Sequence, residues 1–276
     1  MVRARLLALT TALVLLATGC SQPDDDSAPD EPIEVWAVGD GPGVRPEARA
    51  VAAMIAKAEP DRLLYLGDIY GPYAERFDSA YGAAGLSDIT LPTAGNHEWP
   101  SQRSEYLAYW REQRGRELPA YYSRRLGGWE VLSINTSEPL GRRSPQLGWL
   151  RRQLREPGTC RLAFMHVPPF SAGRHGDDSD LRPIWEALTG RAALLVAAHD
   201  HSMQRLAARQ GITTLISGAG GRALYPLDQQ DPRLQFGNNT DYGALMLRLR
   251  PGIAKFQFRA LDGAELDSGR VRCQQG

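Results

Sequence analysis

Short apolar runs alternate with longer amphipathic runs over the first two thirds of the chain. The short runs have the length and composition of strands buried in a sheet, and they cover residues 33–38, 62–66, 89–93, 131–135, 161–165 and 192–198. Helical patterns lie between several of them, at residues 46–58, 104–114 and 144–155. The first helix has a proline in its first turn and the last begins with a Ser-Pro pair. This alternation predicts an α/β fold.

The pattern changes after residue 211. Four further runs read as strands joined by tight turns, at residues 212–217, 244–250, 253–260 and 265–273. We expect them to form a second, mostly antiparallel layer. The intervening segment 218–241 is rich in Gly, Asn, Asp and Pro, which predicts a long surface loop.

The N-terminus has the pattern of an export signal. Arg3 and Arg5 precede an apolar stretch at residues 6–17 that is too short to span a bilayer and has the length of a secretory signal. The stretch ends in Leu-Ala-Thr-Gly-Cys, which resembles the lipobox of bacterial lipoproteins. That resemblance implies lipidation of Cys20, and plain signal cleavage is the alternative.

The segment that follows predicts a tether. Residues 21–32 are rich in Asp, Pro and Ser and cannot form a core. We therefore expect a lipoprotein signal peptide at residues 1–19, a flexible tether at 20–32 and one folded domain, which would carry the function, at 33–276. This organisation predicts an exported protein of the cell envelope, anchored by lipid at Cys20.

Composition narrows the possible functions. The chain has 276 residues, of which 42% are hydrophobic and 23% charged, so it can bury one large core. Its 32 basic and 32 acidic residues leave no net charge, and therefore no overall electrostatic attraction to nucleic acid or to an anionic membrane. Besides Cys20, only Cys160 and Cys273 remain, and in an exported protein they can form a disulfide. Two free thiols are the alternative.

Polar residues follow the predicted strands at the point where each strand ends. Three strands run into glycine and a polar residue, at Gly39-Asp40, Gly67-Asp68 and Gly95-Asn96. Two later strands run into His166 and into His199-Asp200-His201. In open α/β sheets ligands bind at the carboxyl ends of the strands, so we expect these side chains in one crevice. Taken singly, the residues after glycine could be ordinary turn residues, but together they form a set that metal ions accept.

The spacing also suggests how two ions could be held. His199 and His201 would leave the same face of an extended segment, so one crevice could use each on a different metal. Asp68 could bridge two ions, and Asn96 adds a neutral oxygen. The resulting cationic site favours a phosphate ester, because two metals roughly 3.5–4 Å apart can activate a hydroxide and clamp phosphoryl oxygens.

Taken in order, these motifs resemble those of the calcineurin-like metallophosphoesterases, and among them the small single-domain purple acid phosphatases. The similarity runs from about residue 35 to 220 and includes His166 followed by Pro168. It implies a four-layer αββα sandwich of two mixed sheets. It also implies two divalent or mixed-valence metal ions, of iron, zinc or manganese.

The resemblance assigns roles to individual residues. It implies one metal held by Asp40, Asp68 and His201, and a second held by Asp68, Asn96, His166 and His199. His97 would contact substrate or protonate the leaving oxygen. His175 would be a second catalytic histidine, with a solvated loop histidine as the alternative.

Three positions depart from the family pattern. Pro42 replaces a histidine that many members have, which fits only the purple-phosphatase branch. Gly71 stands where that branch has the tyrosine that binds iron(III) and gives the colour. Tyr70, one place earlier, and Tyr73 are the candidates for such a ligand, and a site without tyrosinate is the third option. Ala198 replaces the usual glycine before His199.

These features predict an exported hydrolase of phosphate esters, specifically an acid-phosphatase-like phosphomonoesterase. A metal-bound hydroxide would attack phosphorus, without a covalent enzyme intermediate. A phosphodiesterase or nucleotide hydrolase on the same metal core is the alternative, and loops 71–87 and 218–241 would decide between them. A non-catalytic surface lipoprotein is a further alternative. The expected partner is a small phosphate ester rather than nucleic acid, with membrane contact through the lipid anchor only.

Overall fold

The computed structural model describes residues 31–41 and 44–273. The predicted signal peptide, lipidation at Cys20, most of the tether and Pro42 lie outside these residues. Within them, no helix is both long enough and apolar enough to cross a membrane.

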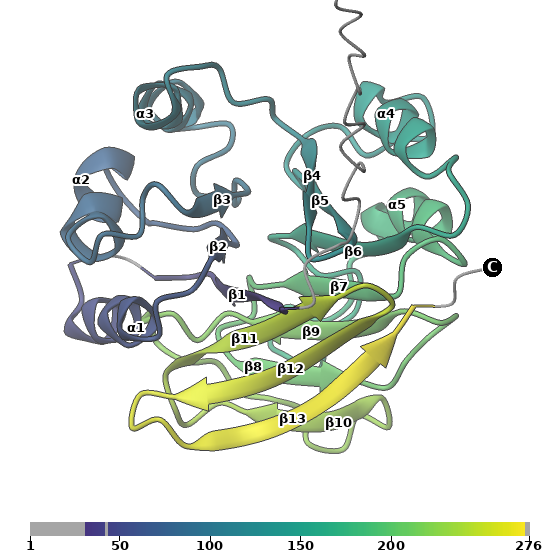
Figure 1. Cartoon of the computed structure of the whole chain (residues 1–276). Helices are drawn as coiled ribbons and strands as arrows, with labels where there is room; N and C mark the ends of the chain where they lie inside the picture. Colours follow the sequence, from purple (N-terminus) through teal and green to yellow (C-terminus); the bar gives the residue numbers. More distant parts are fainter. Residues whose placement is uncertain (1–30, 42–43, 274–276) are drawn as a thin grey trace, which may run out of the picture.

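Two sheets pack face to face between layers of helices (Figure 1). The six-stranded sheet has the order β13 (Glu265–Arg272), β12 (Ile253–Ala260), β11 (Gly243–Arg250), β1 (Ile33–Val38), β2 (Arg62–Tyr65) and β3 (Thr90–Pro92). The seven-stranded sheet has the order β10 (Leu234–Asn238), β8 (Met203–Leu206), β9 (Thr213–Ser217), β7 (Leu194–Ala197), β6 (Cys160–Met165), β5 (Trp129–Ile134) and β4 (Tyr122–Leu126). Both sheets mix parallel and antiparallel pairs.

The helices divide between the outer faces of the two sheets, on opposite sides of Figure 1. Beside the first sheet lie α1 (Pro46–Lys57), α2 (Tyr73–Phe77), which continues into a π-helical turn (Asp78–Gly82), and α3 (Arg103–Arg114). Beside the second lie α4 (Pro145–Gln153) and α5 (Arg182–Leu188), which follows a 3-10 turn (Ser179–Leu181). The expected four-layer αββα sandwich is therefore confirmed.

The sequence patterns have direct physical causes in this architecture. The central strands β1, β2, β6 and β7 are covered on both faces, which is why they read as continuous apolar runs. Helix α1 buries Ala48, Val51, Ala52 and Ile55, which share one face at helical spacing. Ser144 caps α4 by accepting a hydrogen bond from the backbone N–H of Leu147 at 3.2 Å.

The expectation of a separate antiparallel layer at the C-terminus is wrong. Strand β9 pairs in parallel with β7 inside the second sheet, whereas β11 pairs antiparallel with β1 and extends the first sheet through β12 and β13. Segment 218–241 is not entirely a loop, because β10 lies within it and pairs with β8. The sequence patterns also missed β4, β8, α2 and α5, which are short elements stabilised by tertiary packing.

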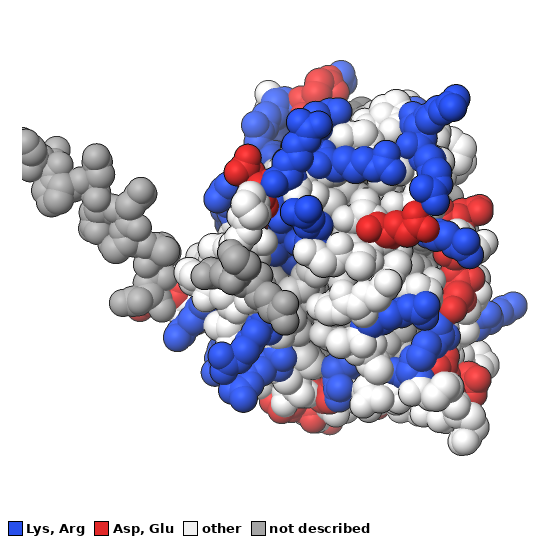
Figure 2. Space-filling model, turned by 90° about the vertical axis from the view of Figure 1, so that its right-hand side faces the viewer, with Lys and Arg blue, Asp and Glu red and all other residues white. Residues whose placement is uncertain are grey.

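Zero net charge does not mean an evenly charged surface. Figure 2 shows the face that carries α4 and α5, where basic side chains gather. The exposed basic residues of these helices and their flanking turns are Arg142, Arg143, Arg151, Arg152, Arg155, Arg182 and Arg191.

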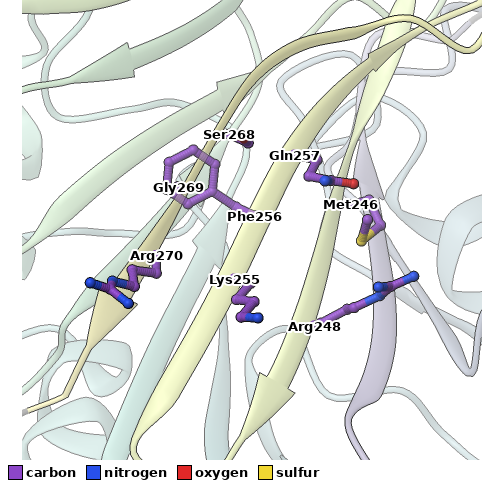
Figure 3. A pocket seen from close by; sticks show the side chains of 8 residues that line it. All are labelled: Met246, Arg248, Lys255, Phe256, Gln257, Ser268, Gly269 and Arg270. Carbon is purple, nitrogen blue, oxygen red and sulfur yellow. The ribbon is translucent and has the colours of Figure 1, made fainter.

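A groove of about 320 Å³ lies over β11, β12 and β13 (Figure 3). Arg248, Lys255 and Arg270 line it together with Met246 and Phe256. Its lining contains no carboxylate or imidazole group, so this groove is not the predicted metal site.

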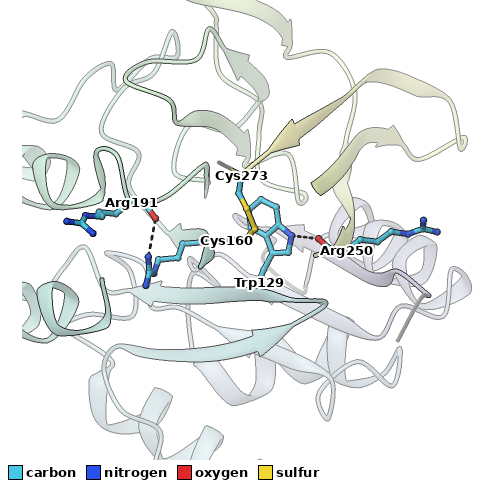
Figure 4. The surroundings of a disulfide bond; sticks show 6 residues. Trp129, Cys160, Arg191, Arg250 and Cys273 are labelled. Carbon is cyan, nitrogen blue, oxygen red and sulfur yellow. Dashed lines mark hydrogen bonds between the residues drawn. A yellow bond between two sulfur atoms is a disulfide. The ribbon is translucent and has the colours of Figure 1, made fainter. Parts of the chain in front are cut away.

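A disulfide links the two sheets. Cys160, at the start of β6, pairs with Cys273, just after β13, with their Cα atoms 5.4 Å apart (Figure 4). Beside it, Trp129 in the second sheet donates an indole hydrogen bond of 2.7 Å to the carbonyl oxygen of Arg250 in the first. The alternative of two free thiols is wrong.

Candidate metal centre and active site

The residues predicted for the site lie together at the carboxyl ends of β1, β2, β3, β6 and β7. Asp40 follows β1, Asp68 and Tyr70 follow β2, and the remaining residues follow the other three strands. Their side-chain oxygen and nitrogen atoms form two neighbouring groups.

The first group contains Asp40, Tyr70 and His201. The Tyr70 hydroxyl lies 3.1 Å from Oδ1 of Asp40 and 2.9 Å from Nε2 of His201. The distance from His201 Nε2 to Asp40 Oδ1 is 3.4 Å. Three potential ligand atoms therefore converge on one point.

The second group surrounds Nε2 of His166. This atom lies 3.0 Å from Oδ1 of Asn96, 3.1 Å from Nδ1 of His199 and 3.3 Å from Oδ2 of Asp68. Ligand atoms of Asp68, His166 and His199 all lie within 4.8 Å of one another. Asp68 also interacts with Tyr70 of the first group. Burial and the charges of Asp40 and Asp68 together raise the pKa of the Tyr70 phenol strongly.

Backbone contacts turn the ligand atoms inward. A carbonyl oxygen can only accept, so Nδ1 of His166 donates to Leu66 at 2.8 Å and Nδ1 of His201 donates to Ala223 at 2.8 Å. The Nε2 atom of each neutral ring then carries a free lone pair. Such contacts are the ones that orient histidine ligands of metals.

Each carboxylate is held in a similar way. Oδ2 of Asp40 accepts from the backbone N–H of His199 at 2.9 Å, which leaves Oδ1 facing Tyr70 and His201. Oδ1 of Asp68 accepts from the backbone N–H of His97 at 3.0 Å, which leaves Oδ2 facing His166.

This donor set fits metal ions. Nε2 of His166 can carry at most one proton, yet it faces two oxygen atoms and a second imidazole nitrogen at hydrogen-bond distance. One proton cannot serve all of these contacts, whereas a cation between them can. Carboxylate, amide oxygen and imidazole are ligands that zinc, iron and manganese accept.

Mutual electrostatics shift the pKa values of this group. Burial disfavours the charged form of His166, but the adjacent Asp68 carboxylate outweighs burial and raises the pKa of His166. Without a cation, Nε2 of His166 therefore holds the second proton of the ring, and a bound cation would take the place of that proton. In return, and against the effect of its own burial, His166 lowers the pKa of Asp68. Burial and the neighbouring His166 and His175 lower the pKa of His199 to about 3, so this ring stays neutral with its lone pair available.

Four residues of the site have left-handed backbone conformations. Asp40, Asp68, Tyr70 and His199 have φ angles of 58°, 64°, 58° and 67°. Residues other than glycine adopt this region rarely, and such strain concentrates at functional sites. Since His199 is left-handed, the expectation that His199 and His201 share the face of an extended segment is wrong. They reach different donor groups because the chain bends between them.

Close packing explains the glycines that precede the polar residues. A Cβ atom on Gly67 would lie 2.5 Å from the backbone nitrogen of Gly95, and one on Gly39 would lie 2.5 Å from Cβ of Ala198. The methyl group of Ala198 therefore occupies the space that Gly39 leaves open. This contact accounts for the departure from glycine before His199.

Glu98 connects two of the loops, a role that the sequence did not indicate. Its buried carboxylate accepts hydrogen bonds from the backbone N–H groups of Asp68, Ile69 and Gly95, at 2.8, 2.6 and 2.8 Å. Burial and the nearby Asp68 raise the pKa of Glu98 to about 7, although these hydrogen bonds oppose the shift. The only available signal was its place in the Gly-Asn-His-Glu motif.

Asp200 has a comparable role at the other end of the site. Oδ1 of this buried residue accepts from the backbone N–H of His175 at 2.9 Å, and Oδ2 accepts from the hydroxyl of Ser171. The contacts fix the loop that carries His175. Asp200 lies between two predicted ligands in the sequence, but nothing there distinguished it from a turn residue.

The two remaining histidines lie at the exposed rim. His97 packs against the Tyr70 ring, with centroids 4.2 Å apart, and its Nε2 lies 3.8 Å from Oδ2 of Asp68. His175 packs against the His199 ring, with centroids 4.1 Å apart. Both are solvent-exposed beside the donor groups, where a substrate can reach them.

The structure separates the two tyrosine candidates. Tyr73 is fully buried and accepts a hydrogen bond from the indole of Trp110 at 3.0 Å, so it belongs to the core. The Tyr70 hydroxyl lies in the first donor group. Tyr70 thus brings a phenol to the site, although it stands one position before Gly71, the place of the tyrosine in the family pattern.

Comparisons of the sequence with known proteins give two matches of note. Residues 18–203 match the calcineurin-like phosphoesterase family. Tartrate-resistant acid phosphatase type 5 of Sus scrofa is 24% identical over 265 aligned positions, covering 78% of this chain and 77% of that protein.

Solved structures share the fold at low sequence identity. A purple acid phosphatase from yellow lupin (Lupinus luteus) seeds superposes with a TM-score of 0.70 at 14% identity, over 87% of this chain and 53% of that one. A dimetal phosphatase from Danio rerio gives 0.62 at 13% identity, over 88% and 100%. GAP50, described as the anchor in the inner membrane complex of Plasmodium, gives 0.72 at 13% identity, over 88% and 90%.

Proposed function

Because this chain belongs to the calcineurin-like phosphoesterase family and is a metal-dependent phosphatase, we propose that it is an exported, acid-phosphatase-like phosphomonoesterase with two metal ions. The observation that carries the proposal is the convergence of two donor groups on either side of Asp68. The name of the Sus scrofa relative supports the acid-phosphatase assignment.

Seven residues would hold the ions. Asp40, Tyr70 and His201 would bind one ion, and Asn96, His166 and His199 the other, with Asp68 shared. When bound, the ions supply Lewis acidity and a lowered pKa for water. Iron, zinc and manganese all suit this donor set.

His97 and His175 are the groups proposed to act on the substrate. Their rings lie at opposite ends of the donor groups, one against Tyr70 and the other against His199. As imidazolium they would donate hydrogen bonds to the phosphoryl oxygens, and one would transfer its proton to the leaving oxygen. Both rings are exposed, so a substrate can reach them.

The leaving group tests these roles. We expect His97→Asn and His175→Asn to lower the rate on phenyl phosphate more than the rate on 4-nitrophenyl phosphate, because nitrophenolate departs without protonation. General acid catalysis contributes about 10²–10⁴-fold, so a loss in this range is expected for the proton donor on phenyl phosphate. Metal content should stay unchanged in both variants. Equal losses on both esters in both variants would argue against a proton-donor role.

The same assay separates the alternative functions. The full-length protein in detergent is assayed on 4-nitrophenyl phosphate and on bis(4-nitrophenyl) phosphate. We expect faster hydrolysis of the monoester. Preference for the diester would favour a phosphodiesterase, and a metal-loaded protein inert on both esters would favour a binding lipoprotein.

Export and anchoring are proposed from the sequence. The basic and apolar N-terminal pattern ends at Cys20, and residues 21–32 would hold the domain away from the bilayer. Mass spectrometry of the mature protein should find acyl groups on an N-terminal Cys20. Cys20→Ser should release the protein from the membrane fraction. A mature protein that begins at another residue and carries no acyl group would favour plain signal cleavage and secretion.

A further inference from the structure

Two exposed arginines lie on aromatic rings of the site. The guanidinium carbon of Arg222 is 4.5 Å from the centroid of Tyr70, and that of Arg174 is 5.1 Å from the centroid of Tyr225. Tyr70 contributes its hydroxyl to the first donor group, and Tyr225 stacks on His201 with centroids 3.8 Å apart. Each guanidinium is therefore one ring away from the donor groups.

The segment that carries Arg222 is fixed to the backbone of the site. The N–H of Arg222 donates to the carbonyl oxygen of Asp40 at 2.9 Å, and the N–H of Tyr225 donates to that of His201 at 3.0 Å. Between them, the carbonyl oxygen of Ala223 accepts from His201. The positions of Arg222 and Tyr225 are thus set by the residues that present the metal ligands.

Arg174 lies in a different segment, the loop that also carries His175. Asp200 fixes its loop through the N–H of the next residue, His175, at 2.9 Å. The same loop joins the segment after Tyr225 through a β-bridge between Gly173 and Leu227. The two arginine-bearing segments are therefore connected, and little ordering would be needed when a ligand binds.

Neither arginine has a carboxylate partner in the described part of the chain. Within residues 31–41 and 44–273, no Asp or Glu oxygen forms a salt bridge with Arg174 or Arg222, whereas Arg205 pairs with Asp267 at 2.7 Å. Stacking on a ring restrains a guanidinium but leaves the N–H groups at its edge free. Those groups suit bidentate binding of a carboxylate or a phosphate.

Resting on the proposed phosphatase function, we propose that Arg174 and Arg222 form a second anion subsite, which selects phosphate esters that carry another negatively charged group. The interposed tyrosine rings separate the guanidinium groups from the donor groups that receive the reacting phosphoryl group. The arginines therefore reach a substituent of the substrate. A carboxylate and a second phosphate share the required chemistry.

Paired substrates test the subsite. The full-length, metal-loaded protein is assayed on phenyl phosphate, on 4-carboxyphenyl phosphate and on inorganic pyrophosphate, the last two providing a carboxylate and a phosphate. We expect the double variant Arg174→Gln with Arg222→Gln to lower kcat/KM at least about tenfold for the two substrates that carry a second anionic group, as loss of a charged hydrogen bond implies. The loss should appear in KM, with phenyl phosphate changed less than about twofold. Arg155→Gln, an exposed arginine after α4, is the control.

A binding measurement keeps the test independent of turnover. We expect calorimetry to find tighter binding of 4-carboxyphenylphosphonate than of phenylphosphonate, with the difference lost in the double variant. Equal losses for ligands with one and with two anionic groups, or no change for any of them, would overturn the subsite. Absence of turnover in the wild type on every ester, with the binding difference retained, would overturn the phosphatase proposal and leave the subsite standing.

Discussion

Tyr70 has a chemical environment that favours a metal ligand over an ordinary phenol. Burial and the charges of Asp40 and Asp68 raise its pKa, so without a cation the hydroxyl keeps its proton and donates to Asp40. A trivalent ion between these oxygens would reverse the balance by stabilising the phenolate. The phenol therefore reports on which metal the site holds.

Replacement of Tyr70 tests this environment. We expect the iron(III)-loaded protein to have a visible tyrosinate absorption band, and Tyr70→Phe to lose it because no other described tyrosine hydroxyl lies in the donor groups. Tyr73→Phe, in the core, should keep the band. A band that persists in Tyr70→Phe would assign the colour to another group.

Glu98 should act on metal affinity without touching a metal. Oε2 of Glu98 accepts from the backbone N–H groups of Asp68 and Gly95, and Oε1 accepts from that of Ile69. Glu98→Gln replaces one of these oxygens by an NH2 group, which cannot accept, so at least one of the contacts is lost. Loss of such a supporting residue weakens metal binding by about 10–100-fold. Competition with a chelator measures the affinity, and Glu112→Gln on the exposed face of α3 is the control. Unchanged affinity would make Glu98 merely structural.

Single residues differ in how far the sequence could reveal them. Asp40, Asp68, His166, His199 and His201 were predictable because each comes within four residues of the end of an apolar strand, and such strand ends meet at one edge of a sheet. Glu98 and Asp200 act through backbone N–H groups of distant segments, and no local pattern records such contacts. Whether each predicted residue binds metal stays a prediction for the variants to test.

At the scale of elements, strands β1 and β7 position the site by their location inside the two sheets. Each lies between neighbours on both sides, so the residues after them are held by hydrogen bonds from several directions. Such central strands were predictable because burial on both faces makes them uniformly apolar. Pairing of β11 with β1 was not, since a strand's partner depends on the whole topology.

The disulfide should stabilise the junction between the sheets. Cys160 and Cys273 are 113 residues apart in sequence, so the link restrains a long loop of the unfolded chain. Removal of a native disulfide typically costs about 2–5 kcal/mol, and we expect Cys160→Ser with Cys273→Ser to fall in that range. Urea unfolding with and without reductant measures it. Reductant should lower the stability of the wild type only, and equal stability of both proteins when oxidised would contradict the expectation.

At the scale of the whole molecule, the active site is an assembly of loops from both sheets. Asp40 and Asp68 come from the first sheet, whereas His166, His199 and His201 come from the second, so neither sheet alone contains a donor group that is complete. The layered fold was predictable from a family resemblance that spans most of the chain. The arrangement of Arg174, Arg222 and Tyr225 was not, because it depends on how two irregular segments fold against the donor groups.

Metal content beside activity, in the wild type and in Asp68→Asn, tests the central claim most directly. Elemental analysis of the full-length protein should find two ions per chain together with hydrolysis of 4-nitrophenyl phosphate, and chelation should abolish both until metal is restored. Asp68→Asn should lose metal and at least about a hundredfold in activity, since even supporting residues cost 10–100-fold. The exposed Asp88→Asn should match the wild type. Full metal content and activity in Asp68→Asn would contradict the account.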